Sequence, residues 1–193
     1  MIRISKALAL VAVLALAACY PPVTTHPVGS TMGLKADPVL SGTWKGAGTD
    51  KKPVYLHFLT RTYGPDTLAV IVPARGEASD LIVVSFTTAR LGAASYLNVR
   101  FAQADGKPVA GQPAGTVPVL YRIDAKGTLT MALMDENAVK AAIAAGRIKG
   151  TVGAGTDGDA TLTGDAKSTD ALFASPAVLR LFHAPFLTLH KVD

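Results

Sequence analysis

The segment Tyr96-Leu97-Asn98-Val99-Arg100-Phe101 decides the fold class, because every second side chain along it is apolar. In an extended chain Leu97, Val99 and Phe101 lie on one face, and the residues between them lie on the opposite face. A period of two residues is typical of a β-strand that packs one face and exposes the other to solvent. We therefore predict a half-buried strand here, with Tyr96, Asn98 and Arg100 on its solvent side.

The segment at positions 119–124 repeats this alternation. Its two sets of alternate residues are Val119, Tyr121 and Ile123, and Leu120, Arg122 and Asp124. One packed face and one exposed face are typical of antiparallel sheets, whereas parallel sheets are covered on both faces. The two segments together predict antiparallel pairing.

Further short runs rich in Val, Ile, Leu, Tyr, Phe and Thr lie between turn residues and predict additional strands. Gly and Asp at positions 63–66, 104–107 and 124–127 favour tight reversals. Short joints between strands favour a meander, so we expect a barrel-like or strongly curved antiparallel sheet. The predicted strands are Gly42–Gly46, Val54–Thr60, Thr67–Pro73, Leu81–Ala89, Ser95–Ala102, Val117–Ile123, Thr128–Met134, Ile148–Val152, Asp159–Thr163 and Leu187–Lys191.

Two short helices are predicted in the C-terminal half. Asp135 precedes the helix-forming segment 138–145 and Gly146 follows it, which is the pattern of a capped helix. A second helix is predicted over 168–182, with an interruption at Ser175-Pro176. The expected fold class is mainly β (α+β), with an antiparallel curved sheet or barrel and these two helices.

The first 18 residues have the three parts of a secretory signal peptide: Arg3 and Lys6, an apolar segment over 7–16, and small residues before a cleavage site. The apolar segment is shorter than the roughly 20 residues that a transmembrane helix needs. Leu16-Ala17-Ala18-Cys19 resembles the lipobox of bacterial lipoproteins. The resemblance implies cleavage before Cys19, lipidation of its sulfur and acylation (palmitate) of the new amino terminus. An ordinary signal peptide with an incidental cysteine is the alternative.

The resemblance also implies a location and a domain organisation. In lipoproteins of enterobacterial type an Asp directly after the cysteine favours retention in the inner membrane, so Tyr20 implies the outer membrane, with the domain on its periplasmic face. Residues 19–38 are expected to form the lipidated N-terminus and a flexible tether, because Tyr20 to Pro38 is rich in Pro and Gly and lacks an apolar period. Residues 39–193 are expected to form a single β-rich globular domain.

Charge and cysteine content limit the partners and cofactors. The formal net charge of +5 falls to +3 without Arg3 and Lys6, and Lys51-Lys52 is the only adjacent basic pair in the sequence. Scattered basic residues do not favour nucleic acid as a partner. Cys19 is the only cysteine, so lipid on its sulfur leaves no thiol for a disulfide or a metal site. No cofactor and no metal are expected.

Motifs that carry catalytic chemistry are weak in this sequence. Residues 153–158 match the G-x-G-x-x-G spacing of dinucleotide-binding loops, but a strand pattern follows where a helix should open. A hairpin loop is expected there. The sequence lacks G-x-S-x-G, S-x-x-K and H-E-x-x-H. The aspartates at 157, 159 and 165 lack the spaced ligands of a calcium loop. A hydrolase would need His57, His183 and His190 to converge, so we expect a non-catalytic domain.

Gly42-Thr43-Trp44 opens the first predicted strand of the domain. It resembles the Gly-x-Trp signature of lipocalins and related calycins, in which the Trp closes one end of an up-and-down barrel. The resemblance implies a calycin-like barrel whose interior binds small apolar ligands, with Trp44 as a candidate ligand-binding residue. The predicted helix near Asp135 interrupts the strands where a lipocalin continues its meander, and Trp44 as part of an ordinary core is the alternative.

The sequence therefore favours a lipid-anchored bacterial envelope lipoprotein with a non-catalytic binding or structural domain. Its expected partners are the membrane, through lipid on Cys19, and an envelope protein or a small apolar ligand. A lipocalin-like carrier is the second hypothesis and a hydrolase the third.

Overall fold

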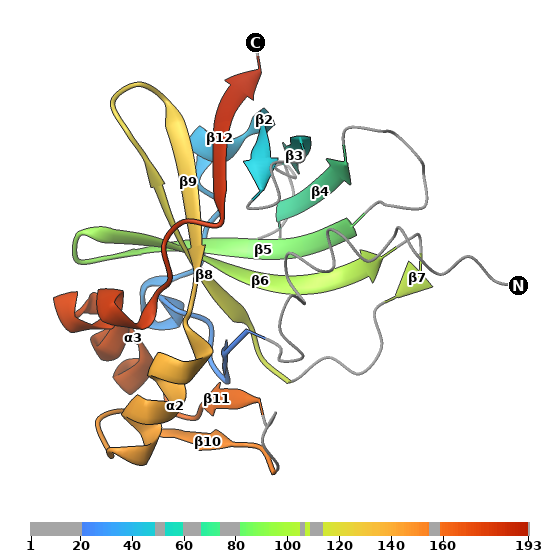
Figure 1. Cartoon of the computed structure of the whole chain (residues 1–193). Helices are drawn as coiled ribbons and strands as arrows, with labels where there is room; N and C mark the ends of the chain where they lie inside the picture. The colour runs from blue at the N-terminus through green and yellow to red at the C-terminus, as the bar shows by residue number, and fades with distance from the viewer. Residues whose placement is uncertain are drawn as a thin grey trace, which may run out of the picture.

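The main sheet contains a meander of seven antiparallel strands, in a computed structural model that describes residues 21–48, 53–59, 67–73, 82–104, 107–108, 114–154 and 159–192 (Figure 1). Each strand pairs with the next one along the chain. A two-residue strand, β7 (Lys107–Pro108), pairs beside β6. The seven strands are β2 (Gly42–Gly48), β3 (Pro53–Leu59), β4 (Thr67–Pro73), β5 (Ile82–Leu91), β6 (Ala94–Ala104), β8 (Val117–Ile123) and β9 (Thr128–Leu133).

The C-terminal strand β12 (Leu187–Val192) completes a ring of eight strands. It pairs antiparallel with β2 on one side and with β9 on the other, so it joins the first and last strands of the meander. A closed ring leaves no unpaired edge in these eight strands. The predicted mainly β fold with an antiparallel, barrel-like sheet is thus confirmed. The helical segment after β9 interrupts the meander as expected, but the chain returns in β12 to close it.

A contiguous apolar cluster fills the inner side of this ring. Alternate residues of the strands whose side chains are described point inward, as in β3, where Val54, Leu56 and Phe58 are each at most 3% exposed. Phe58 and Phe86 meet edge to face with ring centroids 5.3 Å apart. The buried members of this inner cluster are Val23, Leu40, Trp44, Val54, Leu56, Phe58, Ile82, Val84, Phe86, Leu97, Val117, Val119, Tyr121, Leu129, Met131, Leu187 and Leu189.

A second layer covers part of the outer side of the ring. It consists of α2 (Glu136–Ala144), α3 (Ala166–Ala174), the 3-10 helix η4 (Pro176–Leu181) and a small sheet of β1 (Val23–Thr24), β11 (Ala160–Leu162) and β10 (Gly150–Val152). Figure 1 shows these elements gathered at one end of the molecule, beside β5, β6 and β8. The buried members of this outer cluster are Val28, Leu91, Tyr96, Met134, Val139, Ala160, Leu162, Phe173 and Val178.

This layer overturns the predicted solvent exposure of one face of β6. Tyr96 and Asn98 are 0% and 2% exposed, whereas Arg100 is exposed as predicted. The Tyr96 hydroxyl donates a hydrogen bond to the Phe173 carbonyl at 2.9 Å. Burial raises the pKa of Tyr96 to about 12. The alternation of apolar and polar residues predicted the strand correctly. The polar face of a strand can nevertheless be buried when each polar group on it has a hydrogen-bond partner.

Both predicted helices are present, with acidic caps. The Asp135 carboxylate accepts the Ala138 N–H at 3.0 Å at the start of α2, as expected. The second helix, α3, begins two residues earlier than predicted, because Asp165 accepts the Ser168 N–H at 2.7 Å. It stops at Ser175, and the chain continues as η4 from Pro176, which confirms the predicted interruption.

Residues 21–41 form a strap that lies against the domain, so the prediction of a flexible tether up to residue 38 is wrong for this part. The strap contains β1 and two 3-10 helices, η1 (Ser30–Met32) and η2 (Pro38–Leu40). Strand β1 pairs in parallel with β11, and Thr24 forms a bridge with Thr116. Val23 and Leu40 belong to the inner cluster, and Val28 belongs to the outer one. The globular domain therefore begins upstream of the predicted boundary at residue 39.

Two buried polar side chains hold the middle of the strap. Asn98 accepts the Val28 N–H at 2.7 Å and donates to the Val28 carbonyl at 2.9 Å. The carboxylate of Asp170, on α3, accepts the N–H groups of Gly29 at 2.6 Å and Thr31 at 3.0 Å, together with the Thr31 hydroxyl. These contacts supply hydrogen-bond partners to backbone N–H and carbonyl groups of the strap that would otherwise have to bond to water.

Among the described residues, no helix combines the length and the apolar composition needed to cross a membrane. The predicted signal peptide and Cys19 lie outside the described residues.

Candidate functional site

Trp44 lies on β2 inside the ring and is 2% exposed. Its indole N–H donates a hydrogen bond to the Leu40 carbonyl at 2.7 Å, which ties the ring to η2 of the strap. The ammonium of Lys191, on the neighbouring strand β12, lies 5.7 Å from the indole centroid. The Trp44 side chain therefore contacts the strap through its indole N–H and β12 through one face of its ring.

A second polar pair joins the strap to the ring. The Tyr121 hydroxyl donates to the Asp37 carboxylate at 2.7 Å, and Tyr121 itself is 6% exposed. Burial raises the pKa of Tyr121 above its ordinary value, and the bonded carboxylate of Asp37 raises it further. This pair keeps a hydroxyl and a carboxylate satisfied next to the inner cluster, so neither is free to act on a ligand.

The inner side of the ring is filled wherever its side chains are described. Every buried member of the inner cluster is at most 6% exposed. Pockets for small molecules are typically 300–1,000 Å³, and side chains lining such a space would keep accessible surface inside it. The side chains of β4 and of residues 101–106 lie outside the described set. Around Trp44 the described side chains pack as a core, with Val99, Ile123, Leu133 and Phe186 partly buried against it.

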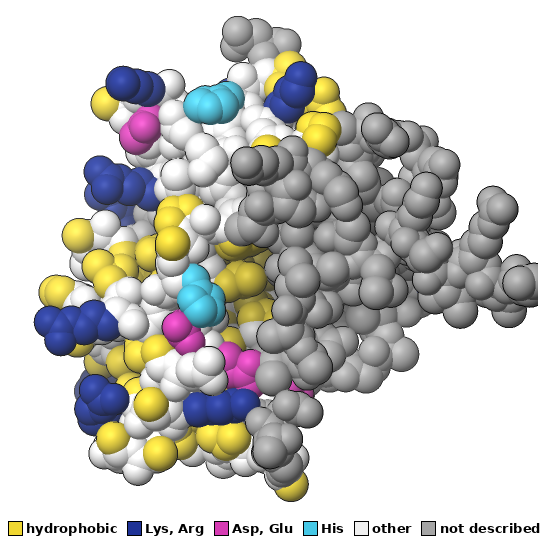
Figure 2. All heavy atoms as spheres, in the orientation of Figure 1, with side chains coloured by type: hydrophobic (Ala, Val, Ile, Leu, Met, Phe, Trp, Pro, Cys, Tyr) yellow, Lys and Arg dark blue, Asp and Glu magenta, His cyan; other side chains and the backbone are white. Residues whose placement is uncertain are grey.

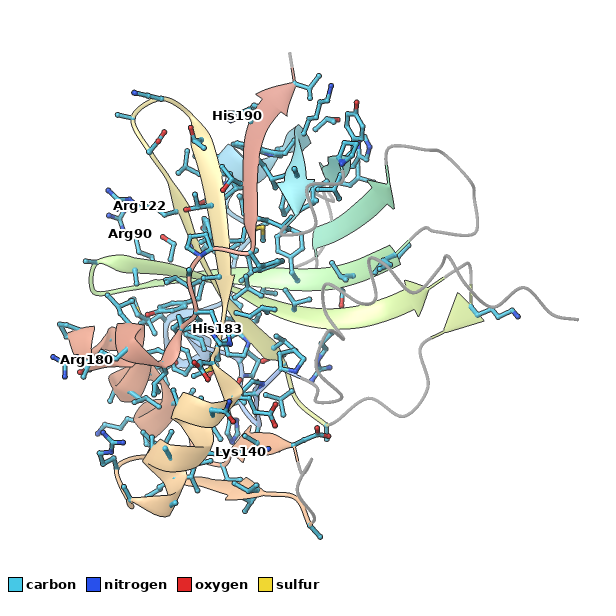
Figure 3. All side chains as sticks on the ribbon, in the orientation of Figure 1. Arg90, Arg122, Lys140, Arg180, His183 and His190 are labelled. Atoms are coloured by element: carbon cyan, nitrogen blue, oxygen red, sulfur yellow. The ribbon has the colours of Figure 1, made fainter. Side chains whose placement is uncertain are left out.

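The three histidines of the hydrolase hypothesis lie in different surroundings. His57 Nδ1 is 2.9 Å from the Thr43 hydroxyl on the outer face of the ring. His190 lies on β12, and His183 precedes β12 with its Nδ1 3.3 Å from the Asp135 carboxylate, which also caps α2. Figure 3 shows His183 beside the second layer and His190 toward the far end of the molecule. The structure does not bring these three side chains together.

The outer face of β9, β12, β2 and β3 carries a row of polar side chains, of which the sequence singled out only His190. In register across the four strands, Thr128 lies beside His190, His190 beside Lys45, and Lys45 beside Tyr55. The Lys45 ammonium is 5.6 Å from the Tyr55 ring centroid. His190 and Lys45 are exposed, and Thr128 and Tyr55 are half-buried. This row lies on the outside of the ring, where its two exposed side chains are accessible to another molecule.

The described residues do not form a metal site or a dinucleotide-binding loop. No group of three or more His, Cys, Asp or Glu side chains could hold a metal ion there. Asp165 caps α3, and its pKa is lowered first by the Ser168 N–H. Strand β11 follows at residue 160 where a dinucleotide loop would open a helix, and the Gly153 N–H bonds the Asp159 carbonyl as in a hairpin. Residues 155–158, including Asp157, lie outside the described set.

The labelled basic side chains of the described part of the chain are spread over its surface (Figure 3) rather than gathered in one patch. Arg90, Arg122, Lys140 and Arg180, labelled in Figure 3, come from four different elements: β5, β8, α2 and η4. Figure 2 shows the Lys and Arg side chains of this view separated by apolar and uncharged surface. Lys140 also pairs with Glu136 one turn earlier on its helix, at 2.6 Å. The absence of a nucleic-acid partner remains a prediction.

Searches for similar proteins found no matching family model, no matching curated protein and no matching solved structure.

Proposed function

We propose that this chain is a bacterial lipoprotein, anchored through lipid on Cys19 to the periplasmic face of the outer membrane, whose domain is a non-catalytic binding or structural module. The observation that carries the proposal is the sequence Leu16-Ala17-Ala18-Cys19 at the end of a basic and then apolar leader. Two or more acyl chains give stable anchoring, because each buried methylene contributes about 0.8 kcal/mol.

The architecture supports a module that acts through its surface. The described side chains inside the ring pack together, and His57 and His183 have separate local partners. The row of Thr128, His190, Lys45 and Tyr55 presents polar side chains on the outer face, and Tyr is enriched in protein–protein interfaces. An envelope protein is therefore the favoured partner.

Labelling with radioactive palmitate tests the anchor. The wild-type chain should incorporate palmitate and sediment with outer membranes, and Cys19→Ala should lose at least nine-tenths of the label. Tyr20→Asp is the matched control, because it keeps the sulfur nucleophile and should retain the label while moving the protein to inner-membrane fractions. A wild-type chain that takes up no palmitate, or a Cys19→Ala chain labelled as strongly as wild type, would overturn the proposal.

A carrier of a small apolar ligand is the second candidate, and the ring of eight strands with Trp44 inside it is the observation that favours it. Trp44 is the only tryptophan in the sequence, so its emission reports on the ring alone. Titration with fatty acids should leave this emission unchanged if the ring is a packed core. A saturable change in emission at micromolar ligand would favour the carrier instead.

A further inference from the structure

Very little chain separates the proposed lipid from the folded domain. Pro22 and Val23 are already buried against the domain, and the first backbone pairing is at Val23. An extended chain spans at most about 3.6 Å per residue, so the Cα atom of Cys19 lies within about 11 Å of that of Pro22. This limit holds for any conformation of the residues between them.

A flexible tether up to residue 38 would have behaved differently. Nineteen residues of flexible chain have a root-mean-square span of about 24 Å and a maximum span of about 65 Å. Such a tether would let the domain turn freely and stand away from the bilayer. The docked strap replaces that freedom with a short attachment at one fixed point on the domain.

The register of the small sheet identifies this point. Strand β1 runs parallel to β11, with Val23 opposite Thr161, so the chain enters beside the start of β11. Strand β10 runs antiparallel to β11, with Val152 opposite Ala160, so it ends at the same place. The attachment point and the β10–β11 hairpin tip therefore lie at the same end of the small sheet.

The described residues of this tip suit contact with lipid headgroups. The exposed or half-buried positions 151–154 and 159 hold Thr, Val, Gly, Ala and Asp, so Asp159 carries the single charge among these described residues. Val152 is 41% exposed, which makes it one of the few large apolar side chains left open to solvent in the described part of the chain. The free energy needed to desolvate such a surface is small. It can therefore lie in the polar layer of a bilayer, which is about 5–7 Å thick on each side.

We infer that the β10–β11 end of the small sheet (residues 151–154 and 159) lies against the phospholipid surface, so that the domain is held in one orientation. The inference rests on the proposed lipidation of Cys19. In this orientation the β8–β9 turn, which lies at the opposite end of the molecule from β10 and β11 in Figure 1, points away from the bilayer. The far end of the barrel is then the part presented to partners.

The strap has enough contacts to hold this arrangement. Val23, Val28 and Leu40 are each at most 2% exposed, so their apolar surface is almost fully removed from water. The Asp170 carboxylate adds charge-assisted hydrogen bonds to Gly29 and Thr31, and Asn98 pairs with both backbone groups of Val28. Release of the strap would break all of these contacts together.

Energy transfer to a lipid dye tests the orientation. The lipidated chain is reconstituted in vesicles of phosphatidylethanolamine and phosphatidylglycerol that carry a headgroup-linked acceptor. A donor dye is attached at Val152→Cys, or at Ala125→Cys in the β8–β9 turn as the matched control, since the sulfur of Cys19 is occupied by lipid. We expect at least threefold higher transfer from the Val152→Cys site than from the Ala125→Cys site.

Insertion of twelve Gly and Ser residues between Tyr20 and Pro21 completes the test without altering the folded domain. The inserted chain has a root-mean-square span of about 19 Å, so the difference between the two dye sites should fall by at least half. Equal transfer from both sites in the palmitate-labelled protein, or a difference that the insertion leaves intact, would overturn the inference. Absence of palmitate label would instead overturn the proposed function, so the two failures are distinguishable.

Discussion

Asp170 is a buried carboxylate whose three hydrogen-bond donors all belong to the strap. It is 7% exposed and accepts two backbone N–H groups and one hydroxyl from residues 29–31. A buried charge is costly unless it is well hydrogen-bonded, and charge-assisted bonds are among the stronger ones in proteins. This one side chain therefore links the stability of α3 to the position of a segment more than a hundred residues earlier.

Replacing Asp170 with Ala should lower the free energy of unfolding by about 2–4 kcal/mol, because the buried Gly29 N–H and the Thr31 N–H lose their acceptor. Asp165→Ala, on the same helix, removes only an exposed N-cap and should lower the free energy of unfolding by clearly less. Urea unfolding of both variants measures the difference. Equal losses in the two variants would contradict the role assigned to Asp170.

The two buried tyrosines predict a loss of stability at high pH. Burial raises the pKa of Tyr96 to about 12, and burial with the Asp37 carboxylate raises that of Tyr121 above its usual 10. The unfolded chain therefore loses these protons at lower pH than the folded chain. The stabilising contribution is complete below pH 10 and is lost as the pH rises through the folded pKa values, at up to about 1.4 kcal/mol per pH unit for each group.

Tyr96→Phe isolates one of these groups. The variant should be less stable by about 1–2 kcal/mol at neutral pH, because the Phe173 carbonyl loses its donor. Its decline in stability above pH 10 should be shallower than that of the wild type. Urea unfolding at several pH values between 8 and 11.5 measures both effects, and equal slopes for the two proteins would contradict the assignment.

Strand β12 is the element that decides whether the sheet is a ring or an open meander. Its approach to β2 depends on Gly46, where an added Cβ would lie 2.0 Å from the Thr188 carbonyl oxygen. No side chain fits at that distance, so the two strands would have to separate. The close contact at Gly46 is thus a condition for the pairing that closes the ring.

Gly46→Ala should lower the free energy of unfolding by about 3 kcal/mol or more, through overpacking and weakened pairing of β12. Gly127→Ala is the control, since Gly127 has a φ of +76° but an added Cβ would meet nothing within 4 Å. It should cost about 1–2 kcal/mol from backbone strain alone. Thermal unfolding followed by circular dichroism compares the two, and a smaller loss for Gly46→Ala would show that the ring tolerates separation there.

Strands and helices were predictable where the signal is local. The turn residues at 124–127 and the alternation in β8 give boundaries that the structure reproduces, and Asp135 caps α2 as expected. The strap was not predictable, because Pro and Gly over residues 21–38 are typical of linkers. Its docking depends on Asn98 and Asp170, which are distant in sequence. The same distant contacts explain why Asn98 is buried on a face that alternation assigned to solvent.

The candidate site was predictable only in part, for a similar reason. Trp44 in the first strand of the main sheet was identified from a three-residue signature, and the structure places it inside the ring. The groups that contact its indole come from the strap and from β12, and no local sequence pattern predicts either contact. The outer row at His190 and Lys45 likewise arises only once β12 lies beside β2.

The whole molecule has two apolar clusters on opposite sides of the same strands. Leu97 and Tyr96, neighbours on β6, belong to the inner and the outer cluster respectively. The strap contributes to both, through Val23 and Leu40 on the inner side and Val28 on the outer side. Because the clusters share strands and the strap, neither can come apart without exposing the other.

Unfolding should therefore follow a single transition. Trp44 emission reports on the ring, and circular dichroism at 222 nm is sensitive to helices such as α2 and α3 in the second layer. The two signals should give the same urea midpoint in the full domain, as two-state behaviour requires. Midpoints that differ by more than the fitting error would show that the second layer unfolds independently.

The position of β12 in the ring has a consequence for the order of events during synthesis. Its residues 187–192 pair with residues 43–48, so the contact that closes the barrel joins two strands that are separated by about 140 residues of chain. Until residues 187–192 have emerged from the ribosome, β2 and β9 each keep an open edge, which is a site for wrong pairing. Native pairing over such a separation is slow. The nascent chain is consequently exposed to proteolysis and aggregation at these edges until residues 187–192 have been made.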